Sequence, residues 1–272
     1  MGWNGRLAGK WHEMKAWKFR TSDDIDLTIH EIGQGRPLIL LHGFFSDADT
    51  NWIKYGHAAL LAEAGFRVIM PDLRAHGQSD KPHDISHYPK DILAEDALAL
   101  IAHLGLVDYD LGGYSLGART VVRMLVGGAT PARVILSGMG FEGLTNTAHR
   151  ADHFRHILDH IGEHPKGSPA WMAEAFLKTT GGDRQALRQI IETFVDTSEA
   201  DLRSLDLPVG IICGAEDQDN GRAAKLASIL PQGKLITVPG NHMSAVVKSE
   251  LGESMLAFLA DTTLVENPQR FA

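Results

Sequence analysis

The sequence of 272 residues has one cysteine, no apolar run long enough to cross a membrane, and no excess of positive charge. The lone thiol, Cys213, excludes a disulfide within the chain. Its place in a predicted core strand favours a buried, unreactive side chain. Because a chain without disulfides suits a reducing compartment, we expect a cytoplasmic protein.

The charge balance excludes two classes of partner. There are 26 Lys and Arg against 34 Asp and Glu, a net charge of −8. This gives no attraction to nucleic acid or to an anionic membrane, and we expect neither as a partner. Residues 1–6 lack the apolar segment of a secretory signal, and Arg6 stands where a myristoylation pattern needs Ser or Thr. We expect a soluble protein that acts on a small molecule.

Predicted strands and helices alternate along most of the chain, which is typical of a mostly parallel sheet flanked by helices, an α/β fold. The pattern predicts about eight strands, at 14–19, 25–31, 38–42, 67–70, 107–111, 132–136, 208–213 and 234–238. It predicts helices at 52–64, 91–104, 118–126 and 220–230.

The alternation stops between residues 138 and 204. This segment is helix-like, rich in His, Met and Phe, and divided by a Pro and Gly cluster at 165–169. We expect a small helical cap at 138–204, inserted after the sixth strand into a core made of 1–137 and 205–272.

Residues 113–117 read Gly-Tyr-Ser-Leu-Gly and lie between a predicted strand and a predicted helix. Such a turn holds its central residue in a strained conformation and leaves no room for a neighbouring Cβ, which explains the flanking glycines. Ser115 would then project from the end of the sheet, above the start of a helix that favours negative charge. The arrangement predicts a nucleophile.

Three other loops also follow predicted strands: His42-Gly43-Phe44, the loop at Asp217 and the loop at His242. The carboxyl ends of parallel strands share one edge of a sheet, so these loops and Ser115 are expected to meet there. Amides freed by the Gly43 turn would be able to bind an oxyanion.

A histidine must activate the serine, and a carboxylate must orient that histidine. His242 is the only histidine after the predicted cap helix; His42 and His76 compete less well, because each is expected to bond to the backbone beside a glycine turn. Asp217 is the expected acid. The rivals that remain open are Asp219, Glu216 and Glu142, and Asp217 itself would also serve as a helix N-cap.

From about residue 31 to 260 the chain resembles the α/β-hydrolase family, specifically its serine-nucleophile, cap-bearing, esterase-like members. The resemblance rests on His42-Gly43-Phe44, the loop 71–79, the serine turn, and the Asp217 and His242 loops, in the family's order Ser, Asp, His. One departure from the family pattern is Ala75, where the family often has glycine.

The resemblance implies catalytic Ser115, Asp217 and His242, and an oxyanion hole formed by the backbone N–H groups of Phe44 and Leu116. It implies hydrolysis of a small to medium, largely apolar carboxylic ester through an acyl-enzyme, with no cofactor and no metal. Carbon–carbon bond hydrolysis, acyl transfer and perhydrolysis remain alternatives, as does a non-catalytic binding protein. A serine at the turn excludes the aspartate-dependent dehalogenases and epoxide hydrolases.

The residues that flank the predicted nucleophile are apolar and suit a hydrophobic acyl or alcohol group, with no evident partner for a phosphate or carboxylate. They are Phe44, Phe45, Leu116, Met139, Phe141 and Met243. Simple membership of the core is the competing interpretation for each.

Two further patterns have competing interpretations. Five histidines at 149, 153, 156, 160 and 164 recur at helical spacing, which indicates the polar flank of a cap helix or, alternatively, a pH-sensitive or adventitious metal-binding stripe. Trp3, Trp11 and Trp17 indicate an N-terminal arm packed on the first strands, with a homodimer contact as the alternative.

Overall fold

The computed structural model describes residues 13–261 and contains one eight-stranded sheet of order β1-β2-β4-β3-β5-β6-β7-β8. Strand β2 is antiparallel to β1 and β4, and the other neighbours are parallel. The bounds are β1 Lys15–Arg20, β2 Asp26–Ile32, β3 Arg36–Leu41, β4 Phe66–Pro71, β5 Asp110–Tyr114, β6 Val134–Ser137, β7 Pro208–Gly214 and β8 Gln232–Val238. The predicted α/β fold is confirmed.

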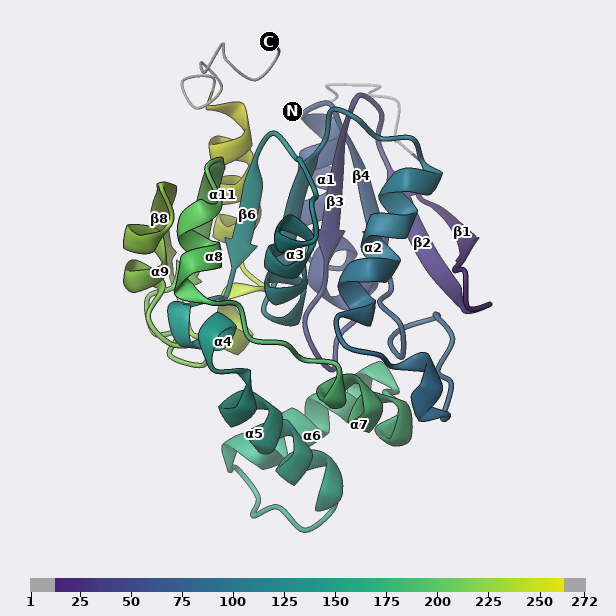
Figure 1. Cartoon of the computed structure of the whole chain (residues 1–272). Coiled ribbons are helices and arrows are strands. Elements are labelled where there is room, and N and C mark those ends of the chain that lie inside the picture. The colour runs from purple at the N-terminus through teal and green to yellow at the C-terminus, as the bar shows by residue number, and fades with distance from the viewer. Residues whose placement is uncertain (1–12, 262–272) are drawn as a thin grey trace, which may run out of the picture.

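Helices cover both faces of the sheet (Figure 1). The helices of the described residues are α1 His57–Glu63, α2 Ile92–His103, α3 Leu116–Val126, α4 Phe141–Thr145, α5 Thr147–Asp159, α6 Pro169–Thr180, α7 Arg184–Glu192, α8 Glu199–Ser204, α9 Ala223–Ile229, α10 His242–Ala245 and α11 Ser249–Ala260, with a short π-helix η1 Asp49–Ile53 and a 3₁₀ helix η2 Ile85–His87. Helices α1 and α11 pack together behind the sheet, while α2 and α3 lie in front.

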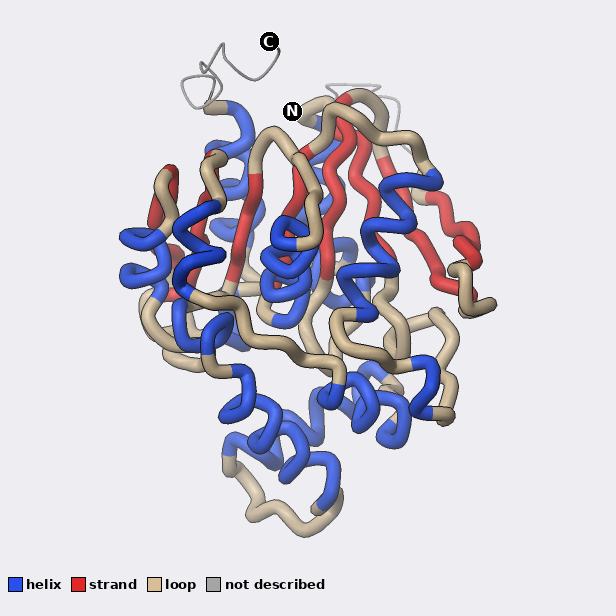
Figure 2. Tube along the Cα trace, in the orientation of Figure 1, coloured by secondary structure: helices blue, strands red, loops and turns tan. Residues whose placement is uncertain are grey.

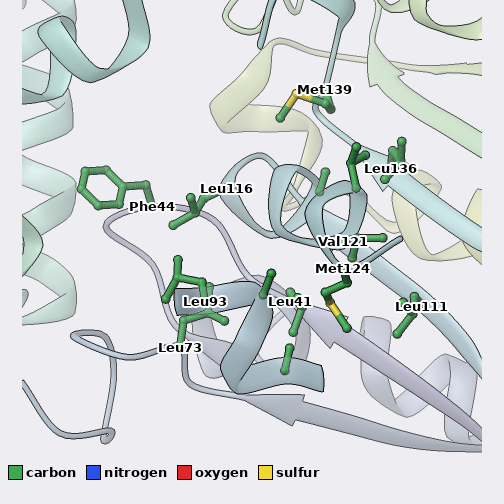
Figure 3. Packing of buried hydrophobic residues seen from close by; sticks show 14 of the residues in the cluster. Leu41, Phe44, Leu73, Leu93, Leu111, Leu116, Val121, Met124, Leu136 and Met139 are labelled. Carbon is green, nitrogen blue, oxygen red and sulfur yellow. The ribbon is translucent and has the colours of Figure 1, made fainter. Parts of the chain in front are cut away.

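Each face of the sheet has its own hydrophobic core, because side chains alternate between the faces of a strand. Trp52, Leu61 and Phe258 belong to the core under α1 and α11. The larger core on the other face includes Leu93 and Val121 and extends to the carboxyl ends of the strands (Figure 3).

All described residues between β6 and β7 are helical or loop, and α4 to α8 occupy this segment. Helices α5, α6 and α7 form a group beyond the carboxyl ends of the strands, separate from the layers on the sheet faces (Figure 2). Helix α8, in contrast, packs against α9 beside the sheet. A hydrogen bond of 2.7 Å from Thr180 Oγ1 of α6 to Phe45 O joins this group to the core. The division into a core and a 138–204 cap remains a prediction.

The strand before Ser115 differs from its prediction, because β5 spans Asp110–Tyr114 rather than 107–111. Val107 is 87% exposed and lies in the loop before β5. The strand runs through two glycines because close packing requires them: a Cβ at Gly112 would lie 2.7 Å from Leu40 Cδ2, and one at Gly113 would lie 2.3 Å from Gly117 C. The prediction from apolar content therefore placed this strand three residues too early.

Two predicted helices are shorter than expected. The first, 52–64, is interrupted by Gly56, whose φ of 82° only glycine adopts readily, so that α1 begins at residue 57. The second, 220–230, begins only at Ala223, after a turn in which Gly221 also has a φ of 82°.

Other expectations fall on features outside the site. Within residues 13–261, no helix is both long and apolar enough to cross a bilayer. Cys213 is buried in β7, and burial raises the pKa of its thiol to about 12. Trp17 lies in β1 and packs against the core, whereas Trp3 and Trp11 lie outside the described residues.

Candidate active site

Ser115 stands at the junction of β5 and α3 in a conformation that L-residues rarely adopt, with φ 54° and ψ −109°. The tight turn depends on glycine, since a Cβ at Gly117 would lie 2.0 Å from Leu41 O and one at Gly113 would collide with the Gly117 backbone. The serine side chain is held at the sheet edge although the residue is only 7% exposed.

The loops after β7 and β8 bring a carboxylate and an imidazole to this serine. His242 Nε2 lies 3.0 Å from Ser115 Oγ, and His242 Nδ1 lies 2.9 Å from Asp217 Oδ2. Because a carboxylate accepts, Nδ1–H donates to Asp217, and Nε2 is left to accept the Ser115 proton. The structure thus brings together the three predicted side chains in one hydrogen-bonded line.

Local hydrogen bonds fix the backbone that carries His242. Asn241 is the N-cap of α10, and its Oδ1 accepts from the amides of Met243 and Ser244 in a capping box. The buried Tyr114 hydroxyl donates to His242 O at 2.6 Å, from the residue that directly precedes Ser115. Backbone and side chain of His242 are therefore both tied to the serine turn.

The rival acids have other partners. Glu142 bonds to the guanidinium and amide of Arg222, with Oε1 2.9 Å from Nε. Asp219 lies 3.4 Å from Arg150 Nη2, and Glu216 is exposed. Of these acids, all within residues 13–261, only Asp217 bonds to His242.

The competing histidines bond to the backbone, as expected. His42 Nδ1 donates to Gly43 O at 2.8 Å, and its Nε2 accepts from Leu73 N at 2.9 Å, which fixes a neutral ring. His76 Nδ1 donates to Arg74 O. Burial lowers the pKa of both rings, that of His76 to about 3.

The two predicted oxyanion donors lie close to the serine. A Cβ on Gly43 would lie 3.6 Å from Ser115 Cβ, so the Gly43–Phe44 segment passes directly beside the nucleophile. Leu116 is the first residue of α3, and the first amides of a helix have no partner within it. Both amides thus belong to backbone that borders Ser115; their role in binding an oxyanion remains a prediction.

The predicted pocket residues divide into two groups. Phe44, Phe45, Met139 and Phe141 are buried members of the larger core, and Figure 3 includes Phe44, Leu116 and Met139 in that cluster. Met243, in contrast, is 50% exposed. That these residues contact the substrate stays a prediction.

Sequence reasoning missed Asn220, which the structure places against the nucleophile. Its buried Nδ2 donates to Gly138 O at 2.8 Å and lies 3.3 Å from Ser115 Oγ. The sequence offered only a predicted helix start at this position. Because α9 begins three residues later, Asn220 instead lies in a loop that turns into the site.

Two arginines were also missed, although the flanking apolar residues had suggested that no partner for an anion was present. Arg119 on α3 is 5% exposed, and the Arg150 side chain on α5 is 12% exposed. Their guanidinium groups stack on Phe194 at 4.3 Å and on Phe154 at 4.7 Å. Both rings contact the Phe44 ring edge-on, with centroid separations of 6.3 Å for Phe194 and 4.6 Å for Phe154.

The histidine stripe is not continuous, which corrects the expectation. Helix α5 ends at Asp159, so that only His149, His153 and His156 lie on it. The rings of His160 and His164 still approach His156, at 4.6 and 5.5 Å. Within residues 13–261, no group of three His, Cys, Asp or Glu side chains is arranged to hold a metal ion.

Comparisons with known proteins bear on the fold and the family. Residues 36–133 match a family model described as the alpha/beta hydrolase fold. A "Non-heme haloperoxidase" of Rhodococcus erythropolis is 27% identical over 88% of this chain and 97% of its own length. "AB hydrolase superfamily protein YisY" of Bacillus subtilis is 36% identical over 106 residues, 39% of this chain and only 38% of the relative.

Among solved structures, an esterase from Exiguobacterium antarcticum superposes with a TM-score of 0.74 at 18% identity, covering 90% of this chain and 99% of the esterase. At that identity the likeness shows the fold alone. Epoxide hydrolases also occur among the relatives at low identity. The protein has the α/β-hydrolase fold, and the resemblance to the α/β-hydrolase family seen in its sequence is confirmed at this level.

Proposed function

We propose that the protein is a serine hydrolase that cleaves small to medium carboxylic esters through an acyl-enzyme. The single observation that carries the proposal is the line from Asp217 through His242 to Ser115, with distances of 2.9 and 3.0 Å. These are hydrogen-bond distances already suited to proton transfer.

In the proposed reaction, His242 Nε2 takes the proton of Ser115 Oγ as the oxygen attacks the ester carbonyl carbon. The amides of Phe44 and Leu116 stabilise the oxyanion, and the imidazolium, held by Asp217, returns its proton to the leaving alcohol. A water molecule then loses a proton to His242 and attacks the acyl-enzyme, which releases a carboxylic acid and restores the serine. The apolar residues around the site favour a largely apolar acyl or alcohol group.

Active-site labelling together with turnover tests this function. We expect a fluorophosphonate to add covalently to Ser115, detected by mass spectrometry of the peptide, and a short-chain aryl ester to be hydrolysed. Ser115→Ala should remove both signals while the protein keeps its helical circular dichroism. Folded wild-type protein that shows neither labelling nor turnover would instead be a non-catalytic binding protein on this fold.

Perhydrolysis is the second candidate, favoured by the similarity to a non-heme haloperoxidase over 88% of the chain. In that reaction hydrogen peroxide replaces water, attacks the acyl-enzyme, and leaves as a peroxycarboxylic acid. Measuring peroxy acid against carboxylic acid from one ester at increasing peroxide concentration separates the two functions. We include in the proposal the helical cap at 138–204 and a cytoplasmic location, supported by the helices that follow β6 and by the buried thiol of Cys213.

A further inference from the structure

Arg119 is a buried cation without a carboxylate partner. Within residues 13–261 its one side-chain hydrogen bond runs from Nε to Gly143 O at 3.1 Å, and no ion pair is formed. Asp196, the acid that most favours its charge, lies beyond ion-pair distance and accepts instead from Thr147 N. The two terminal nitrogens of Arg119 therefore keep unused donors.

Arg150 is nearly as poorly satisfied. Its Nε is buried with no hydrogen-bond partner among the described residues, and its only ion pair is the 3.4 Å contact with Asp219. Burial and the neighbouring Arg150 together lower the pKa of Arg119 to about 10, and burial lowers that of Arg150. Because the two guanidinium groups stack on rings that both contact Phe44, two like charges lie in one buried aromatic cluster, where water screens them little.

Both cations belong to the surroundings of the nucleophile. Arg119 lies one helical turn after Ser115, and its amide donates to Ser115 O at 3.0 Å. Its Gly143 partner donates to Asn220 O, and Asn220 in turn reaches Ser115 Oγ. Arg150 is held by Asp219, whose amide donates to Asp217 Oδ1 at 3.1 Å.

A small pocket of about 20 Å³, room for about one water molecule, lies between α2, α3 and the segment 193–195. Leu116, Arg119 and Phe194 line one part of it, so the Arg119 side chain borders a cavity beside the residue that follows Ser115. The other charges that line it, Asp91 and Arg123, are paired with each other at 2.7 Å. Arg119 is left as the cation available to a ligand in this pocket.

From these contacts we infer that Arg119 and Arg150 form an anion-binding subsite, and that the ester hydrolysed at Ser115 carries a free carboxylate. This inference rests on the proposed esterase function and narrows its substrate class. A carboxylate would accept from the unused guanidinium donors and neutralise the repulsion between them, and guanidinium is the group best matched to a carboxylate in shape. Apolar carbon between the two ends of the substrate would pack on Phe154 and Phe194.

Substrate pairs matched in length test the inference. The probes are the monoethyl esters of succinic, glutaric and adipic acids and the carboxymethyl ester of butanoic acid, each against a neutral ester of equal length. We expect kcat/KM to favour at least one anionic ester. In Arg119→Met and Arg150→Gln the ratio of anionic to neutral kcat/KM should fall by about 10- to 100-fold, the usual effect of losing a hydrogen bond to a charged group.

Arg155→Gln is the matched control. Arg155 is on the same helix as Arg150 but pairs with Asp152 and Glu192, so the variant removes one charge without altering the subsite. It should leave the ratio unchanged. If Arg119→Met fails to fold, Arg150→Gln alone decides the test.

The two proposals fail in different ways. If Ser115 is labelled by the fluorophosphonate and neutral esters are cleaved, but no anionic ester is preferred or the arginine variants keep the preference, the subsite is refuted and the esterase stands. If no ester is cleaved, calorimetric titration of the wild type with glutarate decides: binding that is lost in Arg150→Gln and kept in Arg155→Gln supports the subsite, and an absence of binding refutes it.

Discussion

The loop 71–79 and the surroundings of Ser115 both bury an arginine, but they treat its charge in opposite ways. Arg74 is fully buried and bonds to both oxygens of Asp96 and of Asp23, at 2.6 to 2.9 Å, and to His87 O. The Arg119 side chain, in contrast, has one hydrogen-bond partner within the described residues, the carbonyl oxygen of Gly143. Burial opposes the charge of both, yet the two carboxylates raise the pKa of Arg74, whereas that of Arg119 is lowered.

The contrast separates an arginine that stabilises the fold, Arg74, from one that we assign to ligand binding, Arg119. A buried ion is stable only when its partners replace the lost water, and the 71–79 loop supplies them from within the chain. The site does not, although the chain also pairs its other inner arginines: Arg133 with Asp110, and Arg123 with Asp91. An unpaired cation therefore marks the site more sharply than an apolar lining does.

Removing Arg74 should have the largest effect on stability. Arg74→Met leaves Asp23 and Asp96 without their cation, and we expect a loss of about 3–5 kcal/mol in the free energy of unfolding. Denaturation by urea measures it. Arg20→Met is the control, because Arg20 pairs with Asp24 and Asp26 at the surface, and loss of these pairs should change the free energy of unfolding far less. Equal losses in the two variants would remove the contrast.

Asp72 in the same loop should make stability depend on pH. Burial opposes its ionisation, but hydrogen bonds from His30 and from the amides of Gln78 and Ala48, with the influence of His42, lower its pKa from 3.8 to about 2. Because the folded pKa is depressed, the stabilisation is complete above 3.8 and is lost as the pH falls toward 2. It amounts to roughly 2 kcal/mol.

Asp72→Asn should remove that part of the acid dependence. The check is the free energy of unfolding measured from pH 5 to pH 2 for both proteins. Parallel curves would show that Asp72 does not titrate differently in the folded and unfolded chains.

Asn220 belongs to the site rather than to the fold, so its loss should act on the reaction. Asn220→Ala removes the donor 3.3 Å from Ser115 Oγ, and we expect kcat to fall about tenfold, equivalent to about 1.4 kcal/mol. Steady-state kinetics and the rate of fluorophosphonate labelling measure this. Asn146→Ala, which truncates an exposed side chain, should change neither rate.

Arg119→Met should have the smallest effect on stability, within about 1 kcal/mol of wild type. The lost bond to Gly143 O and the lost stacking on Phe194 are offset by removal of an uncompensated charge, and Met keeps most of the volume. Urea denaturation alongside Arg74→Met makes the comparison direct. A loss near that of Arg74→Met would identify Arg119 as a structural cation.

The sequence predicted those parts of the site that depend on strand ends. Ser115, Asp217 and His242 each follow a strand, and parallel topology brings such positions together whatever the details of packing. The glycines around Ser115 added a steric reason for the turn. The prediction of β5 failed because apolar content cannot show that Gly112 and Gly113 are demanded by close contacts with β3 and α3.

The charged part of the site was not predictable in this way. Arg119 and Arg150 have no local pattern that marks them as buried, since their burial depends on residues distant in sequence, such as Phe194 beside Arg119 and Asp219 beside Arg150. Asn220 was predicted to begin a helix, but that helix, α9, begins at Ala223 and leaves Asn220 in a loop. One signal was available: Arg119 follows the nucleophile by one helical turn, a position that must lie near the site.

The buried, weakly acidic thiol of Cys213 has a practical consequence. At neutral pH almost none of it is present as thiolate, so we expect the natural chain not to react with maleimide reagents. A cysteine introduced on the exposed side of α6, for example at Met172, would be the one position to accept a fluorophore. Fluorescence from that position would therefore report on the environment of α6 without first removing a native thiol.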